Sequence, residues 1–303
     1  MSYRKVIGIA ALVVLGCAAG GYYYLRERSL GAERPPEFPS EGKPMSAPTP
    51  ETPAPATTVA PTPASSSTMT PTASKNKEPI AEPGLPLRSG EVLEYTASVA
   101  NLSNVANLTL QVGAHKDFFG KNAWHLQAFA HTESPLRMVF ELDDQFDSYS
   151  DASTMASLQY EMHLSERGQK VNTVQRMAST GNEPAPSGVT ETRVLPGTRD
   201  PLGMMEYLRN VDWTKTAEVR CPVYDGHKLY DVRAKLASAG EAVTVPAGSY
   251  KASKIEIRVF ESGEEMKDTH FTIYIANNVA RTPVLLEAVM PFATARVELQ
   301  KAK

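Results

Sequence analysis

Hydrophobic and polar residues alternate along much of the chain from Gly90 onward. In EVLEYTASV (91–99), four apolar residues share one face of an extended chain, and charged or hydroxyl-bearing residues occupy the other face, with Val92 as the exception. This period of two is typical of antiparallel strands with one buried and one wetted face. Because such strands recur, we expect a large antiparallel sheet, which must cover its apolar face by curling or by packing. The same pattern occurs in NLTLQV (107–112), AWHLQAFA (123–130), LYDVRAKL (229–236), SKIEIRV (253–259), FTIYI (271–275) and ARVELQ (295–300).

One segment, RDPLGMMEYLRNVDW (199–213), breaks this alternation. Asp200 is a favourable N-cap, and Pro201 suits the first helical position. Apolar residues then recur at three-residue spacing with two further apolar residues beside them, which predicts an amphipathic helix of roughly two to three turns. We expect this helix to plug or cover the curled sheet. Its apolar positions are Leu202, Met204, Met205, Tyr207 and Leu208.

The amino-terminal 28 residues have the composition of an export signal. An uncharged run from Val6 to Leu25 is just long enough to span a bilayer as a helix, at about 30 Å. It is compatible with an uncleaved signal anchor, with a lipoprotein signal whose lipid-bearing residue is Cys17, or with a cleaved signal ending near 16–19. The tyrosines at 22–24 resemble an interfacial aromatic belt and favour the anchor, with lipidation of Cys17 as the open alternative. Each interpretation places the rest of the chain outside the cytoplasm, attached to the cell membrane in the first two.

A proline-rich spacer follows this segment. Of the 23 prolines, 14 lie between Pro35 and Pro86, in a stretch with almost no large apolar residues. Such a stretch cannot bury enough surface to offset the entropy of ordering, and repeated prolines favour an extended tether. We therefore expect three parts: a signal anchor or lipoprotein signal at 1–28, a disordered spacer at 29–86 and an antiparallel β domain at 87–303.

Charge and reactive residues exclude some functions and leave others open. The net charge is -3 with both signs interspersed, so nucleic-acid binding has no support. Cys221 is the single cysteine of the folded part, and its context predicts a quiet, buried thiol. The acidic run from Asp143 to Asp151 lacks calcium-loop spacing, and we interpret it as solvated charge that protects a sheet edge. No nucleophile, phosphate-loop or dinucleotide motif occurs, so we expect a protein without cofactor, metal or catalytic site.

Five segments of the folded part occur in a characteristic order: GEVLEY, FDSYSDASTMASLQYEMHLSERGQK, DPLGMMEYLR, VPAGSYKASKIE and IANNVARTPVLLEA. Their order and spacing resemble the bacterial exported family known as domain of unknown function 3108, over about residues 90–299. The resemblance implies a mainly β fold, in which a large curved antiparallel sheet forms a half-open β-barrel with a short helix on its concave face. It implies no established activity. Many members carry residues like Trp-Ser-Asp-Asp where this chain has Ile275–Asn278, so any site that those acids serve is weakened here.

The apolar face of the sheet and helix is the remaining candidate for function. Its simplest interpretation is hydrophobic core, and the sharper one is a pocket that admits a lipid or acyl chain. We therefore expect a membrane-tethered, non-enzymatic envelope protein that binds an apolar ligand or an envelope partner. The alternatives are an assembly factor without a pocket, or a hydrolase or transferase using carboxylates near 143–151 or Asp225. The candidate pocket residues are Tyr95, Trp124, Leu126, Met204, Met205, Tyr207, Leu208, Ile257 and Phe271.

Overall fold

The computed structural model describes residues 86–138, 140–178, 188–267, 270–290 and 293–303. The predicted anchor, Cys17 and the proline-rich spacer lie outside these residues. Among the helices of the described part, none has the length and apolar composition needed to cross a membrane. The strands are β1 (Val92–Val99), β2 (Leu102–Val112), β3 (Lys116–Phe118), β4 (Lys121–Thr132), β5 (Asp143–Asp151), β6 (Ser157–Glu166), β7 (Gln169–Ala178), β8 (Thr190–Arg193), β9 (Glu218–Tyr224), β10 (Leu229–Val245), β11 (Gly248–Glu261), β12 (Glu264–Glu265), β13 (His270–Ala276), β14 (Pro283–Met290) and β15 (Ala293–Ala302).

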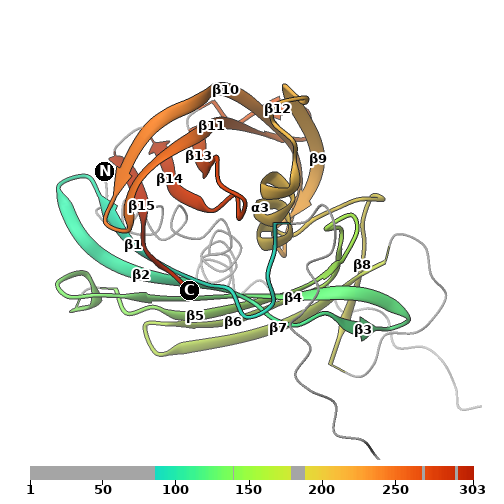
Figure 1. Cartoon of the computed structure of the whole chain (residues 1–303). Helices are drawn as coiled ribbons and strands as arrows, with labels where there is room; N and C mark the ends of the chain where they lie inside the picture. The colour runs from blue at the N-terminus through green and yellow to red at the C-terminus, as the bar shows by residue number, and fades with distance from the viewer. Residues whose placement is uncertain (1–85, 139, 179–187, 268–269, 291–292) are drawn as a thin grey trace, which may run out of the picture.

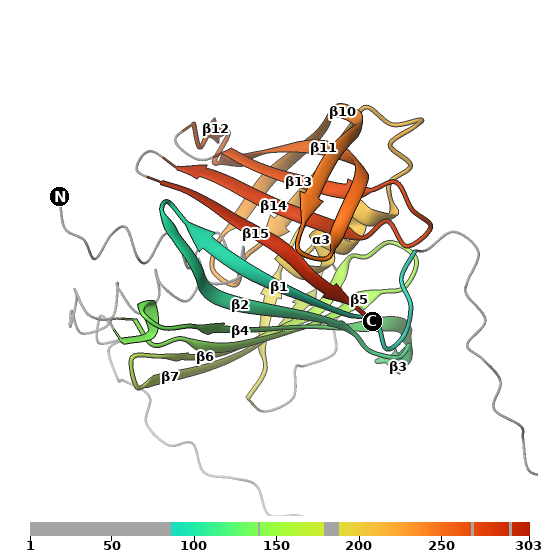
Figure 2. The ribbon, with the colours of Figure 1, turned by 60° about the vertical axis from the view of Figure 1, so that its left-hand side comes forward.

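All fifteen strands of the described residues belong to one sheet, with the order β8-β7-β6-β5-β4-β2-β1-β15-β14-β13-β11-β10-β9 and β3 and β12 at its margins. Pairing is antiparallel except between β7 and β8. Strands β9 to β15 curve over the flatter layer of β2 and β4–β7, and β1 joins the two (Figure 2). The large antiparallel sheet predicted from the alternating pattern is therefore confirmed, as is the mainly β, curved form that the family resemblance implies.

The α-helix of the described residues, α3 (Pro201–Asn210), lies inside the ring of strands (Figure 1). The segment just before it closes the open side of the roll. Ser157 on β6 donates its backbone N–H to Thr198, and the backbone of Arg199 bonds to β9 on its other side, at 2.8–3.0 Å. The helix entrance thus bridges two strands from opposite ends of the sheet order, which explains how an open sheet can enclose a core.

Register and burial agree along the inner face of the sheet. In β1, Leu93, Tyr95 and Ala97 are buried, while the residues between them are half-buried. Tyr274 on β13 is an exception: the alternation in FTIYI places it on the wetted face, but it is buried. Its hydroxyl group donates a hydrogen bond to Glu287 at 3.1 Å. The long β10–β11 hairpin reaches across to β14 and β15, and Ala247 at its turn donates its backbone N–H to β15. The hairpin therefore covers part of the sheet's outer face.

Candidate functional site: the concave face and helix α3

The N-terminus of α3 is fixed to the flat layer by the side chain of Asp200. One carboxylate oxygen accepts the backbone N–H of Gly203 at 2.9 Å, as in a standard N-cap, and confirms the predicted helix start. The other oxygen accepts the hydroxyl groups of Ser148 on β5 and Ser157 on β6. Burial raises the pKa of Asp200, and these hydrogen bonds act in the opposite direction. The helix therefore cannot move relative to β5 and β6 without exposing or breaking a buried polar cluster.

The C-terminal turn of α3 carries a second buried polar cluster. Arg209 is fully buried and donates to both carboxylate oxygens of Glu91, at 2.9 and 3.0 Å, and to Glu206 at 2.9 Å. It also donates to the carbonyl of Ala280, in the loop between β13 and β14, at 2.9 Å. Burial raises the pKa of Glu206 to about 7, although Arg209 acts to lower it. The guanidinium group of Arg209 thus joins three segments that are far apart in sequence: the residue just before β1, helix α3 and the β13–β14 loop.

The nine predicted pocket residues belong to two apolar clusters or pack against them. Tyr95, Trp124 and Leu126 belong to the larger cluster, and Met204 and Leu208 belong to the smaller one on the β9–β13 side. The remaining four predicted residues are only partly buried: Met205 and Tyr207 pack against both clusters, Ile257 against the smaller and Phe271 against the larger.

Three partly buried side chains lie on the inner face of strands β11, β13 and β14. Ile257 on β11 is opposite both Ala234 and Phe271, which places all three on the face that carries the core. Leu286 on β14 is opposite Ile273 in the same face and is also partly buried. We call Met205, Tyr207, Ile257, Phe271 and Leu286 the interior apolar patch. Its three strand residues share the inward face, its two other members are on α3, and all five keep some accessible surface, unlike a fully packed core.

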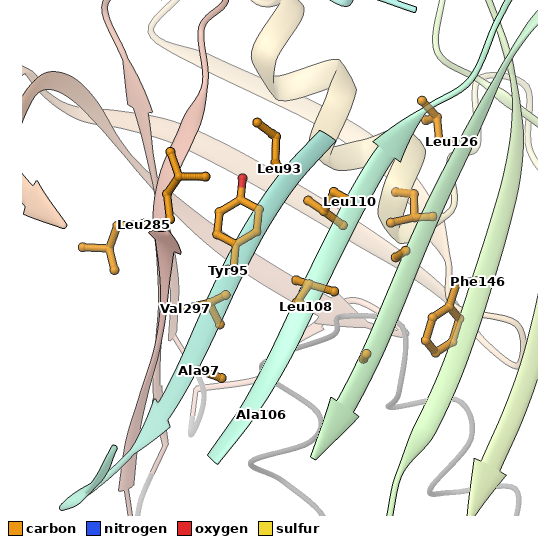
Figure 3. Close-up of a cluster of buried hydrophobic side chains, with 14 of the residues drawn as sticks. Leu93, Tyr95, Ala97, Ala106, Leu108, Leu110, Leu126, Phe146, Leu285 and Val297 are labelled. Carbon is orange, nitrogen blue, oxygen red and sulfur yellow. The ribbon is translucent and has the colours of Figure 1, made fainter. Parts of the chain in front are cut away.

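Next to this patch, alanines line the inner face across neighbouring strands. Ala288 on β14 is opposite both Phe271 of the patch and Ala295 on β15. Ala97 on β1 is opposite Ala106 on β2, and the two lie side by side among larger residues in Figure 3. Between these two pairs the alanines are offset, because Ala295 is opposite Val99 and Ala130 is opposite Leu108. Sequence alternation identified several of these positions as inward-facing, but their proximity across five strands depends on strand order and register. This alanine floor consists of Ala97, Ala106, Ala128, Ala130, Ala288 and Ala295.

The interpretation of the acidic run at 143–151 as solvated edge charge is wrong for two of its residues. Strand β5 lies between β4 and β6, so it is not an edge strand. Asp144 is 3% exposed and faces inward opposite Ala130 at the far side of the alanine floor. Asp147, on the outer face, is 5% exposed and accepts hydrogen bonds from His125 and two glutamines, at 2.7–2.8 Å. Asp143 and Asp151 remain accessible.

Other candidate residues occupy structural positions. Asp225 is buried and accepts the backbone N–H groups of His227 and Lys228 in the β9–β10 turn, each at 2.8 Å. Cys221 is free and buried against Met204, and burial raises the pKa of its thiol, as the predicted quiet cysteine requires. Within the described ranges, no group of three or more His, Cys, Asp or Glu side chains is arranged to hold a metal ion.

The fold can be compared with solved structures of low sequence identity. A β-barrel-like protein of domain of unknown function DUF1849 from Brucella abortus is 11% identical, with a TM-score of 0.46, over 71% of this chain and 97% of that chain. A protein from Parabacteroides distasonis, provisionally described as a lipoprotein, is 12% identical, with a TM-score of 0.34, over 72% and 97% of the two chains. A protein from Bacteroides fragilis, provisionally described as exported and having a YmcC-like fold, is 10% identical, with a TM-score of 0.30, over 72% and 98%.

No curated protein matches the chain. A sequence profile of the family described as protein of unknown function (DUF3108) matches residues 94–300, from β1 to β15. This match confirms the family resemblance drawn from the five ordered segments and covers nearly all of the folded part. The chain belongs to the DUF3108 family.

Proposed function

We propose that this chain is a membrane-tethered, non-enzymatic protein of the cell envelope whose concave face binds an apolar ligand such as an acyl chain. The observation that carries the proposal is the interior apolar patch. Ile257, Phe271 and Leu286 are large apolar side chains on the inward face of the sheet, and they are only partly buried. Met205 on α3 is also partly buried and packs against both apolar clusters. Apolar surface left accessible costs about 25 cal/mol for each Å², which a bound apolar ligand recovers. A methionine and aromatic rings also adapt to flexible ligands.

The alanine floor supports an elongated ligand rather than a compact one. From Ala288 on β14 to Ala130 on β4, the floor crosses four strand-to-strand steps, or about 19 Å at a spacing of about 4.8 Å. Alanine side chains project only one carbon from the backbone. Other side chains cover these alanines in the unliganded chain, where they are 0–6% exposed, so a chain of methylene groups would reach the sheet by displacing those side chains. In the proposed bound state, an acyl chain takes the place of these side chains across the strands, with one end at the interior apolar patch.

Ligand binding is tested with the full chain purified in a mild detergent. Native mass spectrometry is expected to detect a co-purifying lipid, and a fluorescent acyl probe is expected to bind the delipidated chain. Ala130→Leu adds bulk to the floor and should weaken probe binding about tenfold or more. The matched control Thr109→Leu adds similar bulk on the outer face of neighbouring β2 and should leave binding unchanged.

Two outcomes would reject ligand binding. The first is a lipid-free chain that binds no acyl probe, which would leave the assembly role as the better explanation. The second is probe binding that Ala130→Leu and Thr109→Leu alter equally. Near-ultraviolet circular dichroism checks that each variant is folded. Phe271→Ser, at a partly buried position, replaces Ala130→Leu if that variant does not fold.

The tether is a separate element of the proposal, supported by the apolar run from Val6 to Leu25 and the spacer after it. Metabolic palmitate labelling of the wild type and Cys17→Ala, with fractionation of cells, separates the three forms. Label that is lost in Cys17→Ala indicates a lipid anchor. An unlabelled chain that stays with membranes indicates a signal anchor, and an unlabelled chain released as a soluble protein rejects the tether.

A further inference from the structure

Two buried carboxyl groups lie beyond the β4 side of the alanine floor. Asp144 is near the start of β5, and Glu166 ends β6, where it forms an isolated bridge with Leu142. Leu142 and Asp144 are two residues apart on the same face, so Asp144 and Glu166 are diagonal neighbours on the concave side. They are 3% and 4% exposed, respectively, and we call them the carboxyl pair.

The surroundings of the carboxyl pair are apolar and poor in hydrogen-bond donors. One oxygen of Asp144 accepts the backbone N–H of Ser165 at 2.8 Å. Its other oxygen is buried and has no hydrogen-bond partner among the described residues. Such an orphaned acceptor in a native interior calls for an explanation, and a ligand that supplies a donor is one. Ala130 lies directly opposite Asp144 on β4 and connects the pair to the floor.

Few charged groups face the carboxyl pair from the elements around it. On β4, the inward positions beside it are Ala130 and Thr132, and the hydroxyl of Thr132 already donates to the carbonyl of Phe140. Asp143 points to the outer side, where Arg137 binds it at 2.7 Å, and it acts on Asp144 only as a nearby negative charge. Arg167, in the β6–β7 turn, lies over the ring of Phe140 and weakly offsets the burial of Glu166.

We propose that the carboxyl pair binds the polar end of the ligand, and that the ligand is an amphiphile whose head donates hydrogen bonds, namely an amine or a hydroxyl group. This inference rests on the proposed function, because the acyl tail must displace the side chains that cover the alanine floor before its head reaches Asp144. A free carboxylate head is disfavoured, since it would bring a third acidic group to an apolar site that already holds two. Burial raises the pKa of Glu166 to about 7, and the charge of Asp144 contributes.

The test compares three ligands that share one tail: dodecylamine, dodecanol and dodecanoate, each displacing the fluorescent acyl probe from the full chain. We expect the amine and the alcohol to compete about tenfold better than the carboxylate. Asp144→Asn and Glu166→Gln are expected to reduce this preference severalfold. The control Asp143→Asn removes an adjacent carboxylate that points to the outer side, so it should keep the preference and exclude a general charge effect.

The outcomes distinguish this inference from the proposed function. If all three ligands compete equally, or if neither variant of the carboxyl pair changes their order, the head-group assignment is overturned while acyl binding stands. If the amine alone is favoured and Asp143→Asn abolishes that preference, surface charge explains it and the assignment is again overturned. If no ligand competes and no probe binds, both proposals fail. A variant enters the comparison only when its circular dichroism spectrum matches that of the wild type. One folded variant, at either Asp144 or Glu166, is enough for the test.

Discussion

Replacing the carboxyl pair by its amide counterparts, Asp144→Asn with Glu166→Gln, is expected to stabilise the folded chain above neutral pH. Burial is the main cause of both perturbations: it raises the pKa of Asp144 to about 6, and it raises that of Glu166 to about 7 with help from the charge of Asp144. A carboxyl group that must ionise in an apolar site weakens the native state. An amide of the same shape keeps the Ser165 hydrogen bond to residue 144 without carrying the charge.

The magnitude follows from the displaced pKa values. For Asp144, the change from 3.8 to about 6 corresponds to about 3 kcal/mol of folding free energy, and for Glu166 the change from 4.5 to about 7 gives a similar figure. The sum overestimates the effect because part of the Glu166 displacement is repulsion from Asp144, and that part is lost once Asp144 is replaced. We expect the double variant to gain roughly 3–5 kcal/mol above pH 8.

The sign of the pH dependence is fixed by linkage. A group with a raised pKa binds its proton more tightly in the folded chain, so its contribution is present below the unfolded pKa and is lost as the pH rises through the folded pKa. The difference between variant and wild type should therefore be near zero below about pH 4 and grow up to about pH 8. Other buried acids, such as Glu206, are common to both chains and cancel in the difference.

The assay is urea-induced unfolding of the full chain, followed by fluorescence or circular dichroism across this pH range. Asp143→Asn is the control: its Arg137 partner lowers the pKa of Asp143, so this variant should lose a little stability at neutral pH instead of gaining it. A double variant that is less stable than the wild type at high pH, or equally changed at all pH values, would refute the assignment of these two groups as buried and poorly solvated.

Three further predictions follow from the contacts of α3 and its neighbours. Arg209→Met leaves two buried carboxylates without their cation and should cost about 3–5 kcal/mol in urea unfolding; a loss below about 1 kcal/mol would contradict the buried cluster. Gly203→Ala should destabilise the chain by about 1–2 kcal/mol despite a gain in helix propensity, because the new Cβ meets the carbonyl oxygen of Met155 at 3.1 Å; a rise in melting temperature would refute this close approach. In a Cys17→Ala background, Cys221 should react with a thiol reagent only at the rate of unfolding, and rapid labelling of the native chain would contradict its burial.

Side-chain periodicity and helix-capping residues predicted individual strands and the start of the helix. The alternation in 91–99 identified β1 and its buried face, and Asp200 followed by Pro201 located the start of α3. Both signals act within a few residues, through side-chain periodicity and backbone capping. Tyr274 shows the limit of this approach, because the β10–β11 hairpin, distant in sequence, covers a face that alternation alone assigns to solvent.

The candidate site was predicted only in part for the same reason. Apolar residues such as Met205 and Phe271 could be proposed from periodicity, and the structure brings them to the inside of the roll. The carboxyl pair could not, because the same aspartate is solvated on an edge strand and buried on a central one. Arg209 and Glu91 are 118 residues apart, and no local pattern indicates that they meet.

The sequence by itself determined the family, the strand periodicity, the position of the helix and an amino-terminal segment with the composition of an export signal. Only the tertiary structure decided which side chains lose water. Desolvation depends on the neighbours that distant segments supply, and the order of strands in the sheet sets those neighbours for Asp144 and the alanine floor. The order of strands therefore creates the carboxyl pair and the alanine floor, on which a ligand would depend. The strands themselves follow from the local alternation of apolar and polar residues.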